Sequence, residues 1–169
     1  MEFLTNGPGQ TKKVGEVLAK EILKTKLFSK ALIIGLEGDL GGGKTTFLQG
    51  FAKGLGIKEK ILSPTFVILK KFKIQKPNLA KRGEMGDEAK SQRSSKFKNF
   101  YHIDCYRIKK PREILNLGFK EIVSNPKNII TVEWANRIRQ ILPKNVIILK
   151  FQFIDNTTRK ITIKISKKL

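Results

Sequence analysis

The sequence predicts an α/β fold: three layers, with a mixed, partly parallel central sheet and a C-terminal hairpin. Three observations favour this class. Short apolar runs recur along the chain, each long enough for one buried strand. Segments with apolar residues at helical spacing lie between some of these runs, and a glycine-rich stretch joins the first run to the helix after it. Such alternation is typical of a sheet covered by helices on both faces.

The first part of the chain predicts a helix, a strand and a second helix. Residues 11–27 carry apolar side chains on one helical stripe, with lysines between them. Residues 31–37 (ALIIGLE) form a nearly continuous apolar run, as expected of a strand buried on both faces. Residues 44–55 repeat apolar side chains at helical spacing, and Gly54 and Gly56 provide a stop.

The rest of the chain predicts mainly strands. Between residues 111 and 124, Pro111 at a helix start and an interruption at Gly118 predict one or two short helices. The final two strands flank Asp-Asn-Thr-Thr and predict a hairpin. The five further strands are expected at residues 65–74, 99–104, 128–133, 145–153 and 159–165.

Length and composition predict one globular domain spanning residues 1–169. A domain typically takes about 100–200 residues, and 40% of this chain is hydrophobic, which suffices for a core. Residues 75–98 differ from the rest because they combine many charges with few apolar residues and no period. We expect a basic, mobile surface loop there.

The formal net charge of +21 suggests a polyanionic partner such as nucleic acid. The excess comes from 28 Lys against 7 Arg, however, and it is spread along the chain. No aromatic-studded basic sheet or recognition helix accompanies it. A lysine excess of this kind is also expected where AT-rich codons dominate a genome, so the charge alone does not predict a specific nucleic-acid site.

Cysteine usage and hydropathy predict a cytoplasmic protein without a membrane partner. Cys105 is the single cysteine and cannot form an internal disulfide, which favours a reducing compartment. The first residues lack the parts of a secretory signal. The longest apolar runs are far shorter than the ~20 residues that a membrane span requires.

The glycine-rich stretch is a phosphate-binding motif. Residues 38–45 (GDLGGGKT) satisfy G-x-x-x-x-G-K-[ST], between a predicted strand and a predicted helix. Glycines let the backbone approach a polyphosphate, and successive N–H groups at the start of the helix can point at phosphate oxygens. Lys44 would neutralise β/γ-phosphate charge, and Thr45 offers a hydroxyl to Mg²⁺. The motif predicts a P-loop NTPase fold that binds a nucleotide.

A P-loop also needs an acidic group at the end of a neighbouring strand to hold Mg²⁺. Two apolar segments end in a carboxylate, namely 99–104 at Asp104 and 128–133 at Glu133. Most strand-end acids merely cap turns. Two such strands in one P-loop chain nevertheless favour a role in holding Mg²⁺ over a simple turn cap.

The motifs leave several nucleotide proteins open. A Ras-type GTPase is excluded because N-K-x-D and a D-x-x-G switch beyond the P-loop are missing. A small-molecule kinase remains an alternative, with 75–98 as its lid and Arg82 and Arg93 as lid arginines. A nucleotide-regulated RNA-binding module is the other alternative.

Four motifs together resemble the bacterial TsaE (YjeE) family of P-loop ATPases. They are GDLGGGKTTF at 38–47, SPTF at 63–66, HIDCYR at 102–107 and VEW at 132–134, in family order. The resemblance covers most of residues 11–165. It does not extend to 75–98, which is longer than the family's usual connection.

The resemblance implies a nucleotide site with bound ATP and Mg²⁺. Thr45 and Glu133 match the family's magnesium-linked residues, and Asp104 matches an aspartate required for activity. The alternative for Asp104 is a salt bridge to Arg107. The family's phosphate-binding residues match Leu40, Gly41, Gly42, Gly43, Lys44, Thr45 and Thr46.

Four further positions match residues around the family's nucleotide. Thr65 lies in a loop that faces the γ-phosphate, with a simple turn as the alternative. Trp134 lies beside the nucleotide, although a lone Trp is more often a packing residue. Thr11 lies where the N-terminal helix approaches the nucleotide, but a helix N-cap explains it equally well. Arg159 aligns near nucleotide-contacting residues. His102 is assigned no catalytic role.

The resemblance also implies a function. The chain would be a slow, partner-coupled, Mg²⁺-dependent ATPase needed for the threonylcarbamoyladenosine modification of tRNA. That modification lies beside the anticodon of tRNAs that read codons starting with A. The expected partners are the TsaD and TsaB-type subunits of the threonylcarbamoyl transferase complex, whose turnover ATP hydrolysis would support.

Overall fold

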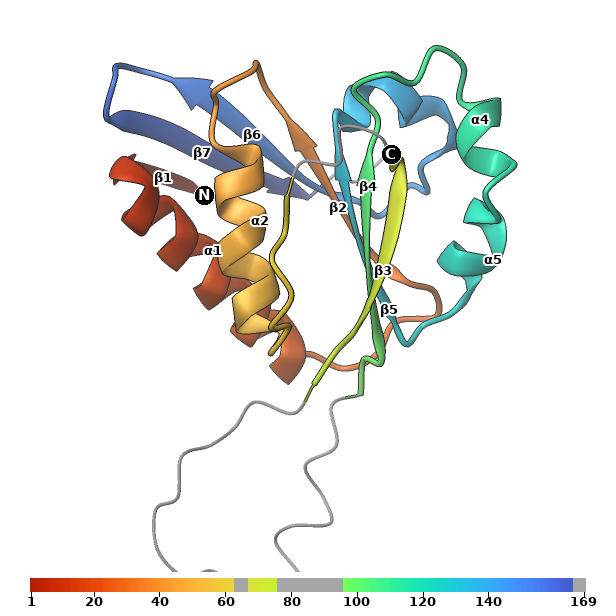
Figure 1. The fold of residues 1–169 in the computed structure, drawn as a ribbon. Helices are drawn as coiled ribbons and strands as arrows, with labels where there is room; N and C mark the ends of the chain where they lie inside the picture. Colours follow the sequence, from red (N-terminus) through yellow and green to blue (C-terminus); the bar gives the residue numbers. More distant parts are fainter. Residues whose placement is uncertain (63–66, 76–95, 166–169) are drawn as a thin grey trace, which may run out of the picture.

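The computed structural model describes residues 1–62, 67–75 and 96–165. Its centre is a seven-stranded sheet with strand order β1-β7-β6-β2-β5-β4-β3 (Figure 1). The strands are β1 (Glu2–Asn6), β2 (Leu32–Glu37), β3 (Leu69–Lys73), β4 (Asn99–Asp104), β5 (Asn128–Glu133), β6 (Ile147–Phe153) and β7 (Thr158–Ile165).

Helices cover both faces of the sheet and complete three layers. The two longest helices, α1 (Gly7–Lys24) and α2 (Lys44–Gly54), pack on one face. The other face carries three short helices (Figure 1). These are α4 (Arg112–Leu115), α5 (Phe119–Ser124) and the 3₁₀ helix η1 (Ala135–Ile141).

The sheet is mixed, with a parallel centre. β2 pairs in parallel with β5 and with β6, and β5 pairs in parallel with β4. The outer pairs β1–β7, β6–β7 and β3–β4 are antiparallel. The predicted mixed sheet and the C-terminal hairpin of β6 and β7 are therefore confirmed. Because β2, β4 and β5 run in one direction, their carboxyl ends lie at one edge of the sheet.

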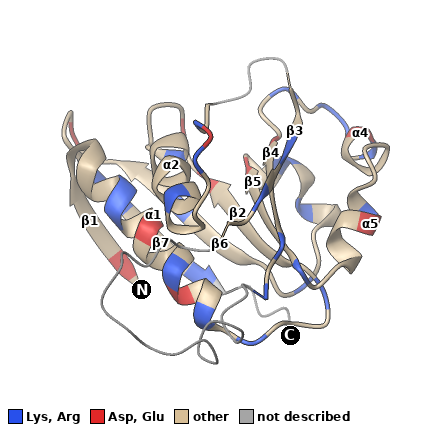
Figure 2. Ribbon diagram, turned by 60° about the horizontal axis from the view of Figure 1, so that its bottom comes forward, with Lys and Arg blue, Asp and Glu red and all other residues tan. Residues whose placement is uncertain are grey.

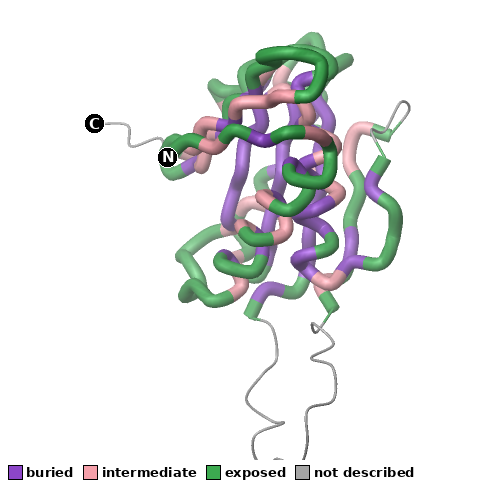
Figure 3. Tube along the Cα trace, turned by 90° about the vertical axis from the view of Figure 1, so that its left-hand side faces the viewer, coloured by how far each residue is buried: buried purple, intermediate pink, exposed green. Residues whose placement is uncertain are grey.

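The central strands are apolar along their length because both of their faces are covered. Every residue of β2, β4 and β5 is buried, and Figure 3 shows buried segments in the interior, with exposed segments around them. Alternate residues face opposite ways. Thus Ile34 of β2 packs with α1 and α2, whereas Ile33 packs with α4, α5 and η1.

The helices α1 and α2 approach each other closely through glycines. A Cβ placed on Gly50 of α2 would lie 1.9 Å from the carbonyl oxygen of Lys12 in α1. A Cβ on Gly15 of α1 would lie 2.3 Å from the carbonyl oxygen of Phe47. At each of these glycines, the backbone of the facing helix occupies the space that a side chain would need. This contact fixes α2, and with it the loop before α2, against the rest of the domain.

Most predicted elements are confirmed, with corrections at their ends. The strands expected at 99–104 and 128–133 have these bounds. The helix expected at 11–27 is wrong at both ends, because it begins at Gly7, with Pro8 in its first turn, and ends at Lys24. The strand β1 and the helix η1 were not expected.

Two further predicted strands are shorter in the structure, and another part of the predicted chain lies outside the described residues. Of the strand expected at 65–74, the structure describes a shorter one, Leu69–Lys73. The strand expected at 145–153 begins later, at Ile147. The loop expected at 75–98, with Arg82 and Arg93, lies mostly beyond the described residues, as does the SPTF motif at 63–66.

Basic side chains are distributed over the surface. Figure 2 shows Lys and Arg on the helices of both layers and on β3. Over the described parts of the chain, no helix has the length and apolar character needed to cross a membrane.

We expect Gly50→Ala to destabilise the domain. Its methyl group would clash with the α1 backbone, which cannot move aside as a flexible side chain would, and overpacking of this kind costs about 1–3 kcal/mol. Gly9→Ala is the control, since a Cβ at exposed Gly9 meets nothing within 4 Å and Ala favours a helix over Gly by about 1 kcal/mol. Urea unfolding followed by circular dichroism compares them, and equal midpoints would contradict the close helix contact.

Candidate nucleotide-binding site

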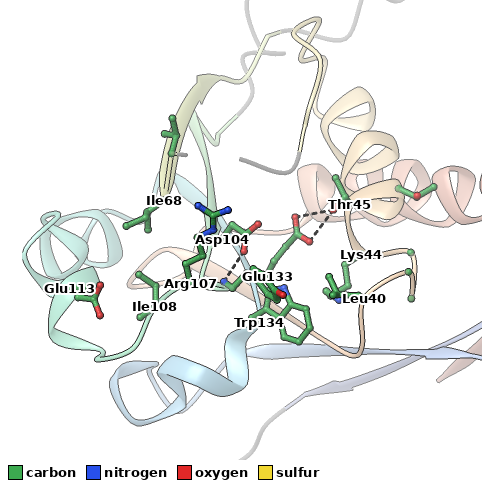
Figure 4. A pocket seen from close by; sticks show the side chains of 16 residues that line it. Leu40, Lys44, Thr45, Ile68, Asp104, Arg107, Ile108, Glu113, Glu133 and Trp134 are labelled. Carbon is green, nitrogen blue, oxygen red and sulfur yellow. Dashed lines mark hydrogen bonds between the residues drawn. The ribbon is translucent and has the colours of Figure 1, made fainter. Parts of the chain in front are cut away.

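A cleft of about 590 Å³ lies at the carboxyl ends of the parallel strands, beside the N-terminus of α2 (Figure 4). Ten of the residues predicted for the site line it. They are Leu40, Gly41, Gly42, Gly43, Lys44, Thr45, Thr46, Asp104, Glu133 and Trp134. The structure thus brings together a glycine loop and the ends of two strands that are distant in the sequence.

The glycine loop has a backbone that other residues rarely adopt. Gly43, directly before α2, has φ +95°, in the left-handed region. Gly38 has φ +133°, and a Cβ there would lie 2.2 Å from the carbonyl oxygen of Phe151 in β6. The first N–H groups of α2 have no acceptor within the helix and, with the helix dipole, favour an anion at this end.

Lys44 lies inside the loop and is buried. Its Nζ donates to the carbonyl oxygens of Gly38 and Asp39, each at 2.7 Å, and lies 4.2 Å from the centre of the Trp134 ring. Burial lowers the pKa of Lys44 below its ordinary value, and the charges of Glu133, Asp39 and Asp104 oppose that shift. The ammonium is therefore held against the backbone of the glycine loop, in the wall of the cleft.

Thr45 and Glu133 meet across the cleft. The Thr45 hydroxyl donates to Glu133 Oε2 at 3.1 Å, with Oε1 at 3.4 Å (Figure 4). Glu133 is buried and ends β5. A hydroxyl and a carboxylate are oxygen donors of the kind that Mg²⁺ prefers. The two residues predicted to bind the metal are therefore adjacent.

These donors fit a metal that arrives with its substrate. Within the described residues, no group of three His, Cys, Asp or Glu side chains is placed to hold a metal ion. Mg²⁺ commonly takes one or two protein ligands together with substrate phosphates and waters. The pair Thr45 and Glu133 beside the glycine loop matches that pattern.

Asp104 lies at the end of β4, directly opposite Glu133 in the strand register. Its Oδ1 accepts the backbone N–H of Tyr106 at 2.8 Å, which fixes the carboxylate (Figure 4). Burial, followed by the charge of Asp104, raises the pKa of the Cys105 thiol to about 12. Cys105 is therefore a protonated packing residue at neutral pH, whereas Asp104 is a fixed carboxylate on the cleft.

Trp134 follows Glu133 and turns the chain out of the sheet. It has φ +59°, and among the described residues it is the one non-glycine residue with positive φ. Its ring packs 5.2 Å from the Tyr106 ring, measured between centroids. Trp134 thus serves as a packing residue and also forms part of the cleft wall.

Two predicted residues support the loop from behind instead of lining the cleft. Arg159 Nε donates to the carbonyl oxygen of Gly41 at 3.0 Å. The methyl group of Thr11 lies 3.6 Å from the point where a Cβ on Gly43 would stand. The N-cap alternative for Thr11 is wrong, because α1 begins earlier and the Thr11 hydroxyl instead pairs with the Thr5 hydroxyl at 2.9 Å.

Sequence reasoning did not predict the contact between His102 and Glu133. His102 Nε2 lies 2.9 Å from Glu133 Oε1, and both side chains are buried. Arg107, considered only as a partner for Asp104, lines the cleft as well and lies beside Asp104 in Figure 4. The sequence signal that could have indicated both residues is that His102 and Arg107 stand in the same HIDCYR run as Asp104. The predicted Thr65 lies outside the described residues.

Comparison with known proteins identifies the family of the chain. The family model for the threonylcarbamoyl adenosine biosynthesis protein TsaE matches residues 5–161. The chain is similar to the tRNA threonylcarbamoyladenosine biosynthesis protein TsaE of Rickettsia typhi, with 36% identity over 144 residues, covering 82% of this chain and 84% of that protein. The protein of the same name from Bacillus subtilis is 31% identical over 163 residues, covering 96% of this chain and 84% of its own length.

A solved structure has the same fold. The crystal structure of Bacillus subtilis YdiB superposes with a TM-score of 0.67 at 28% identity, covering 98% of this chain and 85% of that one. The family match spans nearly the whole described sheet and the complete glycine loop. The chain therefore belongs to the TsaE family, which is named for its part in the biosynthesis of tRNA threonylcarbamoyladenosine.

Proposed function

We propose that this TsaE-family protein is a Mg²⁺-dependent ATPase that supports turnover of the threonylcarbamoyl transferase complex. The observation that carries the proposal is one cleft in which a buried lysine, a threonine hydroxyl and a buried glutamate meet. These are Lys44, Thr45 and Glu133. A glycine loop at a helix N-terminus supplies the backbone donors beside them.

The loop would hold the triphosphate of ATP. Phosphoryl transfer depends chiefly on positioning and on stabilising charge, with little covalent chemistry left for the protein. The backbone N–H groups around Gly43 and the Lys44 ammonium perform both tasks for the β- and γ-phosphates. Arg159 keeps the loop in place through its bond to the carbonyl oxygen of Gly41.

Thr45 and Glu133 would hold Mg²⁺, with the nucleotide completing its coordination. When bound there, Mg²⁺ would neutralise charge on the phosphates and polarise the γ-phosphoryl group. The Glu133 carboxylate lies beside the Thr45 hydroxyl, with Oε2 3.1 Å from it, so both groups can bind one metal ion. Asp104, its neighbour in register, presents a second carboxylate that can orient the attacking water.

The proposed substrate of the reaction is ATP, and tRNA is modified by the partners. We propose TsaD and TsaB-type subunits as the partners, since the family is named for threonylcarbamoyl adenosine biosynthesis. In the part of the chain that the structure describes, Lys and Arg are spread over several helices and strands (Figure 2). This distribution favours an indirect or weak contact with tRNA.

We expect Lys44→Ala to weaken ATP binding by about tenfold or more. The substitution removes a charge-assisted hydrogen bond of about 1.5–3 kcal/mol, and each 1.4 kcal/mol corresponds to a factor of ten. Isothermal titration calorimetry with Mg²⁺ and ATP measures the affinity. Lys53→Ala, at an exposed position of the same helix, should bind as the unsubstituted protein does. Equal affinities for the two variants would contradict the role of Lys44.

We expect Glu133→Gln and Asp104→Asn each to lower ATP hydrolysis more than tenfold while the domain stays folded. Both changes keep the side-chain shape and remove the charge. Asp104→Asn also retains an oxygen to accept the Tyr106 N–H. Phosphate release measures the rate, with exposed Glu121→Gln on α5 as the control. Undiminished hydrolysis in Glu133→Gln would mean that another carboxylate serves the metal.

The pathway role predicts repeated turnover only in the presence of this chain. TsaD and TsaB-type subunits, tRNA and threonylcarbamoyl donor are combined with the chain and ATP, and modified adenosines per complex are counted by mass spectrometry. We expect multiple turnovers with the unsubstituted chain and about one with Glu133→Gln, because the complex is not reset. Multiple turnovers without any TsaE-family chain would disprove the resetting role.

A further inference from the structure

His102 lies next to the proposed metal site but has no assigned part in it. Along β4, alternate residues on the α2 side change from apolar to polar, in the order Phe100, His102 and Asp104. On β5 the same face carries Thr131 and then Glu133. Parallel pairing sets His102 opposite Thr131. The next pair on the same face, two residues further along each strand, is Asp104 opposite Glu133. The His102 ring reaches forward to Glu133, with Nε2 2.9 Å from Oε1.

We propose that His102 is a positioning residue that holds the Glu133 carboxylate for Mg²⁺. The proposal rests on the proposed function, in which Glu133 and Thr45 bind the metal. One carboxylate oxygen, Oε1, is held by the histidine. The other oxygen, Oε2, is the nearer of the two to the Thr45 hydroxyl, at 3.1 Å. The carboxylate is thus fixed between β4 and α2, with Oε2 directed at the metal side.

The direction of this hydrogen bond follows from chemistry. A carboxylate that binds a metal is ionised and can only accept hydrogen bonds, so His102 Nε2 must carry the hydrogen and donate it. The side chains of both residues are at most 3% exposed. With the histidine in place, water therefore has little access to this contact, and His102 is the donor to Oε1. Without His102, a buried carboxylate would lose a partner and its fixed orientation.

Metal sites commonly depend on such outer partners. Groups that hydrogen-bond to a ligating side chain orient it, and removing one typically costs about 10- to 100-fold in metal affinity or activity. If His102 only filled the core, its substitution would change the stability of the domain but not its affinity for Mg²⁺. The two roles are therefore separated by measuring how much Mg²⁺ improves ATP binding.

The experiment compares ATP dissociation constants in EDTA and in Mg²⁺ by calorimetry. Their ratio is the magnesium enhancement. Three variants are used: His102→Gln, His102→Asn and His102→Leu. The Gln amide nitrogen lies the same number of bonds from Cα as histidine Nε2, so it can still donate to Glu133. The Asn amide is one bond shorter and cannot reach, and Leu has no donor.

We expect the enhancement to fall about 10- to 100-fold in His102→Asn and His102→Leu and to be largely retained in His102→Gln. ATP affinity in EDTA should be unchanged in all three. Thermal unfolding by circular dichroism verifies that each variant is folded. If His102→Leu does not fold, the matched amides Gln and Asn still give the comparison.

Two results would overturn the assignment. A full magnesium enhancement in folded His102→Asn would show that Glu133 needs no partner, and equal losses of affinity in EDTA and in Mg²⁺ would show a purely structural role. Failure of the proposed function has a different signature. In that case the unsubstituted protein would itself show no ATP binding or no enhancement by Mg²⁺.

Discussion

The parallel pairing of β4, β5 and β2 is the constraint from which the site follows. This pairing sets Asp104 opposite Glu133 and Glu133 opposite Leu36, so the carboxyl ends of three strands meet at one edge. The glycine loop begins directly after β2. A shift of one residue between β4 and β5 would turn every side chain of one strand to the other face. The carboxylates would then no longer share the cleft with Thr45.

The polar ends of these buried strands are tolerated because each group has a partner. Glu133 accepts from Thr45 and lies against His102, and Asp104 accepts the Tyr106 N–H. Burying an ionised carboxylate without such partners is strongly unfavourable. The close glycine contact between α1 and α2 places Thr45 accurately enough to be one of these partners. Core packing and site geometry therefore depend on each other.

Sequence reasoning was most successful where one strong local signal was present. Continuous apolar runs predicted β2, β4 and β5, and the glycine motif predicted the loop. β1 was missed because Glu2–Asn6 is half polar and extends only by pairing with β7. η1 was missed because it starts from the left-handed Trp134 and has non-helical dihedrals at Ile138. The contact between His102 and Glu133 depends on strand register, which a single sequence does not specify.

The left-handed turn at Trp134 places the chain's single tryptophan against the Lys44 ammonium, 4.2 Å from the ring centre. An indole in this position is sensitive to the nearby charge. The tryptophan fluorescence therefore comes from the wall of the cleft, and we expect it to change when a bound anion alters the position of the ammonium. The protein thus contains its own optical reporter, and stopped-flow experiments can follow ligand arrival without a dye or a labelled nucleotide.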